Sequence, residues 1–297
     1  MGNKIILLGA KGMVGNNILN NLKNSYDILA LSHQELDIRK YDRVEELIRE
    51  FKPDYVINAA AYTKVDDAEN NKDYCYEVNA YSVRNLAKIC NTCTITLIHF
   101  STDYVYDGNK KSPYEEDDIP HAINVYGESK FLGDKYIQES GCNYLILRTS
   151  WVYGPHGNNF IKKIIQACID NNDLKIISDQ FGVPTSSVFI SKVLEKILNN
   201  FSVNNKHHII KEIYNVCPSG CTSWYELAKK VVEYLTIERP SCKTTIDPIT
   251  SSDYVSLANR PNYTVLSNDK LCSHFDINIK NWDHYLMEFL KDYNKSK

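Results

Sequence analysis

Three side chains in two short stretches carry the groups needed to reduce a carbonyl. Thr102 stands within Ser-Thr-Asp-Tyr, and Tyr126 and Lys130 are four residues apart in Tyr-Gly-Glu-Ser-Lys. A hydroxyl can donate a hydrogen bond to an oxygen that gains charge, and a phenol of pKa about 10 becomes a better acid when an ammonium lowers that pKa. We therefore predict that Tyr126 is the general acid, that Lys130 lowers its pKa, and that Thr102 polarises a ketone.

The Tyr-x-x-x-Lys spacing alone is weak evidence, because this chain has 21 tyrosines and repeats the spacing elsewhere. The pairs are Tyr106/Lys110, Tyr126/Lys130, Tyr225/Lys229 and Tyr293/Lys297. Only the Tyr126 pair follows the fourth expected strand and lies on an expected helix, where residues four apart share one face. We therefore predict that Tyr126 and Lys130 act together. The alternative is an ordinary pair on a helix surface.

A glycine-rich stretch, Gly9-Ala-Lys-Gly-Met-Val-Gly15, comes directly after the apolar residues 5–8. Glycines let a backbone approach a pyrophosphate, and the helix N-terminus that follows supplies free N–H groups and a positive dipole end. This context predicts a dinucleotide-binding loop, with a purely structural turn as the alternative, and Lys130 would then also hold the nicotinamide ribose. The expected cofactor contacts are Gly9, Lys11, Gly12, Met13, Val14, Ser32, His33, Asp37, Ile38, Ala59, Ala60, Ala61, Tyr126 and Lys130.

The choice between NAD and NADP depends on the end of the second strand. A carboxylate there usually binds the ribose 2′-hydroxyl of NAD, but this strand ends in Leu-Ser-His33 without an acid. Glu35 and Asp37 follow shortly and can still reach the adenosine, while Lys11 and His33 suit a 2′-phosphate. We predict NADPH, with NADH as a possible second cofactor. The alternative for Lys11 is a side chain that faces solvent.

The first half of the chain alternates short apolar runs with helical patterns. The runs at 4–8, 28–31, 55–58, 94–100 and 144–148 predict strands, and helical periodicity covers 14–22, 44–51, 83–90 and 124–140. Strands separated by helices form right-handed βαβ units in a parallel sheet covered on both faces. The fold class is therefore α/β, a doubly wound parallel sheet of the Rossmann type, with a smaller C-terminal α/β substrate-binding lobe.

The second half is less regular and predicts two lobes. Residues 1–153 form the expected dinucleotide-binding domain, to which parts of 186–217 return as a helix near 191–199 and a strand near 213–216. The expected substrate-binding lobe comprises 154–185 and 218–297, with helices around 224–235 and 282–293.

Composition limits the partners. A net charge of −3 and ordinary fractions of hydrophobic (43%) and charged (24%) residues give no reason to expect nucleic acid. The sequence shows neither a signal-peptide pattern nor an apolar run long enough to cross a membrane, so we expect a cytoplasmic protein without membrane contact. The nine cysteines, including Cys90-Asn-Thr-Cys93, are expected to be reduced and packed as small apolar groups, with no metal bound.

The motifs together resemble the extended short-chain dehydrogenase/reductases, and among them the dTDP-4-dehydrorhamnose reductase family. The phrases that carry the resemblance run through most of the chain: Asn58-Ala-Ala-Ala-Tyr-Thr63, Val65-Asp66, Ser101-Thr-Asp-Tyr-Val-Tyr-Asp-Gly108, Asn124-Val-Tyr-Gly-Glu-Ser-Lys130, Arg148-Thr-Ser-Trp-Val-Tyr153, Asn158-Asn-Phe160, Asp179-Gln-Phe-Gly-Val-Pro-Thr185, Ser223-Trp224 and Arg260-Pro261. The resemblance implies reduction of the C4 ketone of a nucleotide-linked 4-keto-6-deoxyhexose, to dTDP-L-rhamnose or to a UDP-linked or N-acetylated analogue.

The resemblance also implies roles for single residues. Thr102, Tyr126 and Lys130 would be the catalytic trio, and the substrate would contact Thr102, Asp103, Tyr104, Trp151, Asn159, Gln180 and Arg260. An arginine fork suits a diphosphate, although Arg260 could instead serve an ion pair, and Trp151 and Trp224 could be core at the interface between lobes. Family members with a metal-linked dimer carry a Glu after the third loop glycine. This chain has Asn16-Asn17 there, so we expect no metal, and a monomer or homodimer.

Two other functions share this pattern. A nucleotide-sugar epimerase or dehydratase of the same fold uses the same trio, although Thr102-Asp103-Tyr104 occupies the stretch where epimerising relatives use Cys and His. A non-catalytic regulatory subunit that resembles the β subunit of methionine adenosyltransferase shares the ancestry. The intact trio favours an enzyme.

Overall fold

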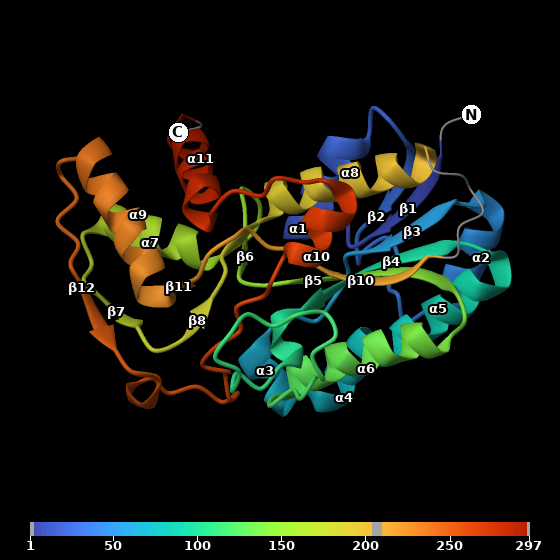
Figure 1. Ribbon diagram of the computed structural model, residues 1–297, viewed down its shortest axis with the longest axis horizontal. Coiled ribbons are helices and arrows are strands. Elements are labelled where there is room, and N and C mark those ends of the chain that lie inside the picture. Colours follow the sequence, from blue (N-terminus) through green and yellow to red (C-terminus); the bar gives the residue numbers. More distant parts are fainter. Residues whose placement is uncertain (1–2, 204–209, 296–297) are drawn as a thin grey trace.

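A computed structural model describes residues 3–203 and 210–295, and its centre is a six-stranded parallel sheet (Figure 1). The strand order is β10-β5-β4-β3-β1-β2. The strands are β1 (Lys4–Leu8), β2 (Asp27–Leu31), β3 (Tyr55–Asn58), β4 (Thr96–Thr102), β5 (Asn143–Thr149) and β10 (Lys211–Asn215). The chain leaves β1 toward β2 and returns to the other side of β1 as β3, so the order reverses there. Ligands of doubly wound sheets bind at the carboxyl ends of the strands at such a point.

Helices cover both faces of the sheet, as the alternation predicts. Figure 1 shows α8 on one side of the sheet and α5 and α6 on the other. The first face packs under α1 (Met13–Leu22) and α8 (Ser187–Val203), and the second under α2 (Tyr41–Phe51), α5 (Ser82–Cys93) and α6 (Val125–Glu139). The strands alternate their buried side chains between these two cores: Ile5 and Leu7 belong to the first, and Ile6 and Leu8 to the second. The Rossmann-type fold is confirmed.

The fourth strand differs from the expected one at both ends. The fourth strand starts at Thr96 rather than at residue 94, because Thr94 takes a left-handed conformation (φ 56°) at the C-terminus of α5. It also runs on to Thr102, which places that hydroxyl at the carboxyl edge of the sheet. Farther along the chain, β10 pairs in parallel with β5 and α8 packs beside α1.

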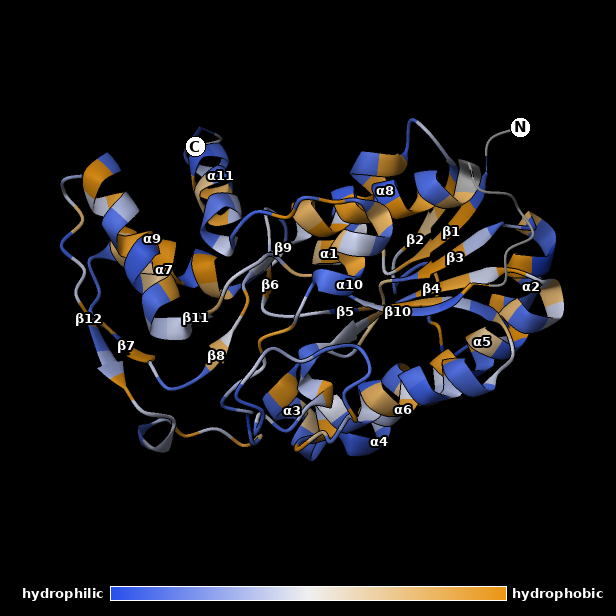
Figure 2. Cartoon of the chain, in the orientation of Figure 1, coloured by the Kyte–Doolittle hydropathy of each residue, from blue (hydrophilic) through white to orange (hydrophobic). Residues whose placement is uncertain are grey.

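A second group of elements lies beyond the carboxyl end of the sheet. It contains α7 (Phe160–Asp170), α9 (Trp224–Glu238) and α11 (Trp282–Lys295), and a parallel pair formed by β7 (Leu174–Ile177) and β12 (Ile246–Ile249). Figure 2 shows apolar residues on α7 and α9 where these two helices face each other. The sequence did not indicate α7, β7 or β12. The short helix α10 (Asp269–Phe275) instead packs toward β10 and α8, so Leu271 belongs to the core of the sheet domain.

Shorter elements connect these parts. They are α3 (Val65–Asn70), α4 (Lys72–Tyr76), the π-helix η1 (Glu77–Tyr81), the 3₁₀ helices η2 (Asp103–Val105) and η3 (Ser251–Asp253), and β6 (Val152–Tyr153), β8 (Phe181–Gly182), β9 (Thr185–Ser186) and β11 (Thr222–Ser223). Within 3–203 and 210–295, no helix combines the length and apolar character needed to span a membrane. All nine cysteines lie in this part of the chain and are free thiols.

Candidate active site

A cavity of about 490 Å³ opens at the carboxyl ends of β1, β3 and β4. It brings together residues from the glycine loop, the third strand, the fourth strand, α6 and the second group of elements. Twelve of the expected site residues line it: Gly12, Met13, Val14, Ala59, Ala61, Thr102, Asp103, Tyr104, Tyr126, Lys130, Trp151 and Asn159. The glycine loop and the predicted catalytic trio, which are about a hundred residues apart in the chain, therefore face one space.

The N-terminus of α6 holds Tyr126 beside Thr102. Asn124 caps this helix, with its side-chain oxygen accepting a hydrogen bond from the N–H of Gly127 at 2.8 Å. Gly127 has no side chain at the point of closest approach: a Cβ there would lie 2.1 Å from the backbone oxygen of Tyr104. The rings of Tyr104 and Tyr126 meet edge to face, with centroids 5.9 Å apart. The close contact between α6 and η2 thus sets the position of the phenol.

Thr102 is the last residue of β4 and caps η2. Its Oγ1 accepts a hydrogen bond from the N–H of Tyr104 at 3.2 Å and donates one to Oδ1 of Asp103 at 3.1 Å. It also lies within hydrogen-bonding reach of the Tyr126 phenol. Asp103 is 2% exposed, and its Oδ2 has no hydrogen-bond partner in the described part of the chain. Burial raises the pKa of Asp103 to about 7, so this carboxyl is about half protonated at neutral pH and largely protonated below it.

The expected lowering of the Tyr126 pKa is wrong for this structure. Burial raises the pKa of the phenol above its usual value. The Thr102 hydrogen bond opposes this rise in part, and the charges of Asp103 and Tyr104 add smaller increases. The physical reason is that desolvation of a phenolate outweighs the favourable contacts. Tyr126 is therefore a fully protonated acid at neutral pH.

Lys130 is 1% exposed and lies one helical turn beyond Tyr126. Its Nζ donates to the backbone oxygen of Phe100 at 2.6 Å and lies 3.0 Å from Nε2 of His99. Burial lowers the pKa of Lys130 to about 8, against the attraction of Asp134, which is also buried. The ammonium is therefore only moderately stable here, and it loses its proton at mildly alkaline pH.

The glycine loop fits a pyrophosphate. Gly9 has a positive φ of 77°, and a Cβ there would lie 2.7 Å from the backbone nitrogen of Ala60. Gly12 occupies the N-cap position of α1, where no side chain accepts the first N–H groups of the helix, and Met13 and Val14 continue into the cavity. These amides can bind an anionic group that enters the cavity. Gly9 and Ala60 do not line the cavity but bring β1 and β3 together behind it.

Glu35 brings a carboxylate to the end of the second strand, although the strand itself has no acidic residue there. Glu35 turns back and accepts hydrogen bonds from the N–H of Ser32 at 2.8 Å and from its hydroxyl at 2.6 Å. These bonds lower the pKa of Glu35, and Lys11 adds a smaller attraction. His33 and Lys11 are exposed beside them. The Glu35 carboxylate, which suits a ribose 2′-hydroxyl, therefore lies close to Lys11 and His33, which suit a 2′-phosphate.

Asp37 and Ile38 have structural partners. Both oxygens of Asp37 accept hydrogen bonds from the guanidinium of Arg39, which lowers the pKa of this carboxyl, and the Arg39 guanidinium lies 4.6 Å from the ring centroid of Tyr74. Ile38 is buried in the core below α2. None of Lys11, Ser32, His33, Asp37 and Ile38 lines the main cavity. The sequence did not indicate Arg39.

Two of the expected substrate residues lie at a second cavity of about 350 Å³ between α7, β7 and the segment before Arg260. Gln180 donates a hydrogen bond to the hydroxyl of Ser251 at 3.2 Å. Arg260 donates to the hydroxyl of Ser256 at 2.6 Å and forms an ion pair with Asp66 at 2.7 Å. The ion pair that we considered as an alternative role for Arg260 is thus present. Arg260 also lines the second cavity.

Stacked indoles stand where the two cavities meet. The rings of Trp151 and Trp224 are parallel within 8°, with centroids 3.5 Å apart, and Phe160 packs against Trp224. Trp224 lines both cavities and Trp151 the larger one. Gly182 leaves room for Trp151, because a Cβ there would lie 2.5 Å from the indole ring. These side chains are both interface core and cavity wall. We did not predict Trp224 or Phe160 as site residues, although Ser-Trp and Asn-Asn-Phe stand among the motifs quoted above.

Asn159 lines the cavity and caps α7. Its side-chain oxygen accepts from the N–H of Lys162 at 3.1 Å, and its amide nitrogen donates to the backbone oxygen of Gly154 at 2.9 Å.

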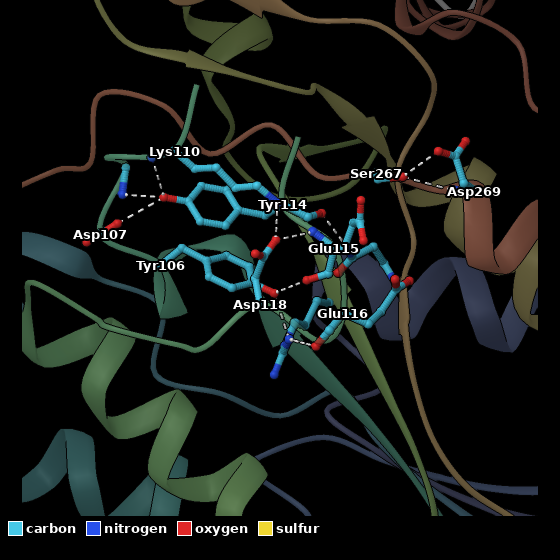
Figure 3. Close-up of polar contacts among 12 residues, drawn as sticks. Tyr106, Asp107, Lys110, Tyr114, Glu115, Glu116, Asp118, Ser267 and Asp269 are labelled. Carbon is cyan, nitrogen blue, oxygen red and sulfur yellow. Dashed lines mark hydrogen bonds and ion pairs between the residues drawn. The ribbon is translucent and has the colours of Figure 1, made fainter. Parts of the chain in front are cut away.

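The other Tyr/Lys pairs are not assembled into this site. Figure 3 shows that Tyr106 and Lys110 belong to a loop network in which Lys110 bonds to Asp118 and the Tyr114 hydroxyl donates to Asp107 at 2.9 Å. Tyr225 and Lys229 lie on α9, outside the lining of the main cavity. Lys297 lies outside the described residues. In the ranges that the structure describes, no group of three His, Cys, Asp or Glu side chains could hold a metal ion.

A parallel doubly wound sheet, a glycine loop at its first crossover and a Tyr/Lys pair at its carboxyl edge define a short-chain dehydrogenase/reductase, an NAD(P)H-dependent oxidoreductase. The family model described as RmlD substrate binding domain matches residues 3–295. With the relatives described next, this match shows that the chain belongs to the dTDP-4-dehydrorhamnose reductase family, as its motifs predicted.

The relatives match over nearly their whole length. The dTDP-4-dehydrorhamnose reductase of Aggregatibacter actinomycetemcomitans is 35% identical over 286 residues, which cover 95% of this chain and 97% of that protein. A crystal structure of the dTDP-4-dehydrorhamnose reductase of Bacillus anthracis in complex with NADP superposes with a TM-score of 0.90 at 31% identity, and covers 98% of this chain and all of that one. The corresponding protein of Clostridium acetobutylicum gives a TM-score of 0.89 at 30% identity, with 98% and 99% covered.

Proposed function

We propose that this protein reduces the C4 ketone of a nucleotide-linked 4-keto-6-deoxyhexose, with NADPH as its preferred cofactor and NADH as a possible second one. The product is dTDP-L-rhamnose or a UDP-linked or N-acetylated analogue. The observation that carries the proposal is the meeting of Thr102, Tyr126 and Lys130 with the glycine loop in one cavity. The relatives named dTDP-4-dehydrorhamnose reductase, one of them crystallised with NADP, support the substrate class and the cofactor.

The cofactor supplies a hydride to the ketone carbon. Tyr126 donates its proton to the ketone oxygen, and the raised pKa of the phenol ensures that it carries this proton. Thr102 turns its single hydroxyl proton from Asp103 to the same oxygen and donates a hydrogen bond there as negative charge develops. Lys130 holds the ribose beside the nicotinamide and, as an ammonium, offsets part of the charge left on the phenolate.

Each cavity has a distinct role in this proposal. The 490 Å³ cavity takes the nicotinamide and the sugar, with Asp103, Tyr104, Trp151 and Asn159 around the sugar. The 350 Å³ cavity takes the nucleotide, with Gln180 at the base and Arg260 at the diphosphate. The adenosine end of the cofactor lies along Ser32, His33, Asp37 and Ile38.

This division of roles matches a division of the chain. We infer that residues 1–153, with segments of 186–217, form the cofactor domain, and that 154–185 and 218–297 form the nucleotide-sugar lobe, except for α10, which packs against the sheet domain. The protein acts as a monomer or homodimer in the cytoplasm, and neither nucleic acid nor a membrane takes part.

The test is an absorbance assay at 340 nm with NADPH and a series of dTDP- and UDP-linked 4-keto-6-deoxysugars, beside an active control reductase. Tyr126→Phe removes only the proton donor, so turnover should fall by about 10²–10⁴ while NADPH binding stays nearly intact. Lys130→Met should weaken both turnover and NADPH binding. The matched control is Tyr225→Phe, which removes the hydroxyl of another Tyr-x-x-x-Lys pair and should leave turnover unchanged.

Two results would overturn the proposal. One is the absence of turnover with every sugar while the control reductase is active. The other is near-normal turnover of Tyr126→Phe. A nicotinamide cofactor that co-purifies, never exchanges and supports epimerisation would show instead an epimerase or dehydratase of this fold. A stable complex with a partner enzyme, without ketone reduction, would show a regulatory subunit.

A further inference from the structure

A buried histidine lies directly behind Lys130. His99, on β4, is 0% exposed, and its Nε2 is 3.0 Å from Nζ of Lys130. Its Nδ1 is 3.1 Å from the side-chain nitrogen of Asn58, at the end of β3. Burial and the Lys130 charge both depress the pKa of His99 far below its ordinary value. The ring is therefore neutral, with one nitrogen that donates a hydrogen bond and one that accepts.

The backbone fixes the orientation of the Asn58 amide. The N–H of Ala60 can only donate, and it lies 3.1 Å from Oδ1 of Asn58. The other amide atom, facing His99, must then be the nitrogen, which donates to Nδ1 of the ring. In this arrangement Nδ1 accepts, so the single ring proton is on Nε2 and points at Nζ of Lys130. Every group is satisfied only when Lys130 is a neutral amine that accepts this bond.

The ammonium form of Lys130 requires a different arrangement. An ammonium has no lone pair and must donate to Nε2, so the ring proton moves to Nδ1. Nδ1 then needs an acceptor, which Asn58 can provide only by turning its amide and withdrawing Oδ1 from Ala60. Gaining the charge therefore costs a hydrogen bond in the loop after β3, whose residues Ala59 and Ala61 line the cavity.

We propose that His99 is a positioning residue which couples the charge of Lys130 to the orientation of the Asn58 amide, by exchanging its own tautomer while it remains neutral. The proposal rests on the function proposed above, which gives Lys130 its role. In this proposal the residues that respond to the protonation of Lys130 include His99 and Asn58 in the sheet and Ala60 in the loop after β3.

Other charged groups near this pair tune the titration but do not replace His99. On α6 itself, Asp134 is buried with Oδ1 4.0 Å from Nε2 of His99, and its Oδ2 accepts from Ser101 at 2.8 Å and lies 3.6 Å from Nε of Arg148 on β5. The titratable and charged groups around Lys130 and Tyr126 on the packed elements are His99, Asp134, Arg148, Cys75, Asp103 and Tyr104. The Asp134 carboxylate attracts the Lys130 ammonium, and because its Oδ1 lies on the Nε2 side of the ring it also favours a proton on Nε2. The direct contacts that exchange the tautomer remain those of Lys130 with Nε2 and of Asn58 with Nδ1.

The direct test is nitrogen-15 NMR of the full-length protein labelled on histidine, in which two-bond couplings identify the tautomer of each ring. We expect His99 to carry its proton on Nδ1 below about pH 7 and on Nε2 above about pH 9, with no charged imidazolium between them, because Lys130 titrates near pH 8. In Lys130→Met the same signal should keep one tautomer throughout. A wild-type tautomer that does not change between pH 6.5 and pH 9.5 would overturn the proposal.

Two substitutions extend the test to activity. His99→Gln places an amide oxygen near Nζ that accepts from the ammonium, and should move the alkaline limb of kcat/KM up by about one pH unit. His99→Asn keeps a group facing Asn58 but is too short to reach Lys130, and should move the limb down, which lowers kcat/KM at pH 8.5 up to about tenfold. Equal effects of both variants at every pH would show a merely structural histidine and refute the idea.

The NMR experiment needs no sugar substrate, so the two proposals can fail separately. A tautomer exchange in a protein that reduces no 4-keto sugar would support the coupling of His99 and Lys130 and reject only the substrate. Turnover with a fixed tautomer would reject the coupling and keep the reductase.

Discussion

Gly127→Ala should separate Tyr126, the proposed catalytic acid, from the Thr102 hydroxyl beside it. A Cβ at position 127 would lie 2.1 Å from the backbone oxygen of Tyr104 and 2.9 Å from its carbonyl carbon, and real Cβ atoms essentially never come closer than 3.0 Å to a neighbour. The start of α6 and the turn η2 must therefore move apart by about 0.9 Å, the difference between 3.0 and 2.1 Å. Both of these Tyr104 atoms belong to the backbone, so no side-chain rotation can relieve the contact.

This displacement acts on the two groups that must reach one oxygen. Tyr126 lies on the helix that moves, and Thr102 lies on the turn from which it moves away. A misplacement of about 1 Å at a catalytic group can cost about 10²-fold in rate, and overpacking costs about 1–3 kcal/mol in the free energy of unfolding. We expect kcat to fall about a hundredfold, with a smaller change in the KM for NADPH because the glycine loop is untouched.

Gly133→Ala is the matched control for stability. It lies on the same helix, and its Cβ would meet the backbone oxygen of Asn79 on η1 at 2.3 Å, so it introduces a similar overlap away from Thr102. Both variants should lose a comparable free energy of unfolding in urea titrations, while kcat at a temperature where both are folded should fall much further for Gly127→Ala. Equal kcat values for the two variants would refute the argument that the contact between α6 and η2 positions the acid.

Further predictions concern the cofactor, the buried carboxyl and the diphosphate. Lys11→Ala should raise the KM for NADPH about tenfold and leave the KM for NADH unchanged. Glu35→Gln should lower the KM for NADPH, because it removes a carboxylate that repels the 2′-phosphate. Steady-state kinetics with both cofactors measures these changes. Because burial raises the pKa of Asp103 to about 7, the folded protein holds a proton that the unfolded chain has lost, so this group lowers stability by about 1.4 kcal/mol for each pH unit between about 4 and 7. Asp103→Asn should therefore match wild type in urea unfolding near pH 4 and exceed it increasingly up to pH 7; a parallel decline of both proteins would contradict the shift. Arg260→Lys should raise the KM for the nucleotide sugar about tenfold with little change in kcat, since a lysine lacks the planar fork for a diphosphate, and an unchanged KM would assign Arg260 to its ion pair with Asp66 alone.

Local sequence patterns predicted the elements of the sheet domain whose residues are contiguous in the chain. The strands at Lys4–Leu8 and Tyr55–Asn58, the loop after the first of them and the helix of Tyr126 each follow from a short run of residues, and β4 needed a correction at each end. The parallel pair of β7 and β12 was not predicted, because 68 residues separate Ile177 from Ile246 and Pro248 interrupts the second strand. A pairing of this kind depends on tertiary contacts rather than on a local period.

The electrostatics of the site depend on burial, which a motif does not report. The Ser-Thr-Asp-Tyr and Tyr-x-x-x-Lys patterns identified the groups that line the cavity, but they did not show the Glu35 carboxylate turned onto Ser32 or the ion pair of Arg260 with Asp66. Those contacts join residues whose side chains meet only after folding. The sequence therefore predicted which side chains line the site, but not their contacts or their protonation states.

The difference matters most for the acid. The motif suggests a phenol made more acidic by its lysine, yet burial raises the pKa of Tyr126 and lowers that of Lys130 to about 8. A reductase needs the proton on the phenol before hydride transfer and needs compensation only afterwards, when the phenolate has formed. A raised phenol pKa satisfies the first requirement, and an amine that is readily protonated and deprotonated near neutral pH satisfies the second. The arrangement in this cavity thus favours proton donation to a ketone, because its acid stays protonated until the oxygen beside Thr102 gains charge.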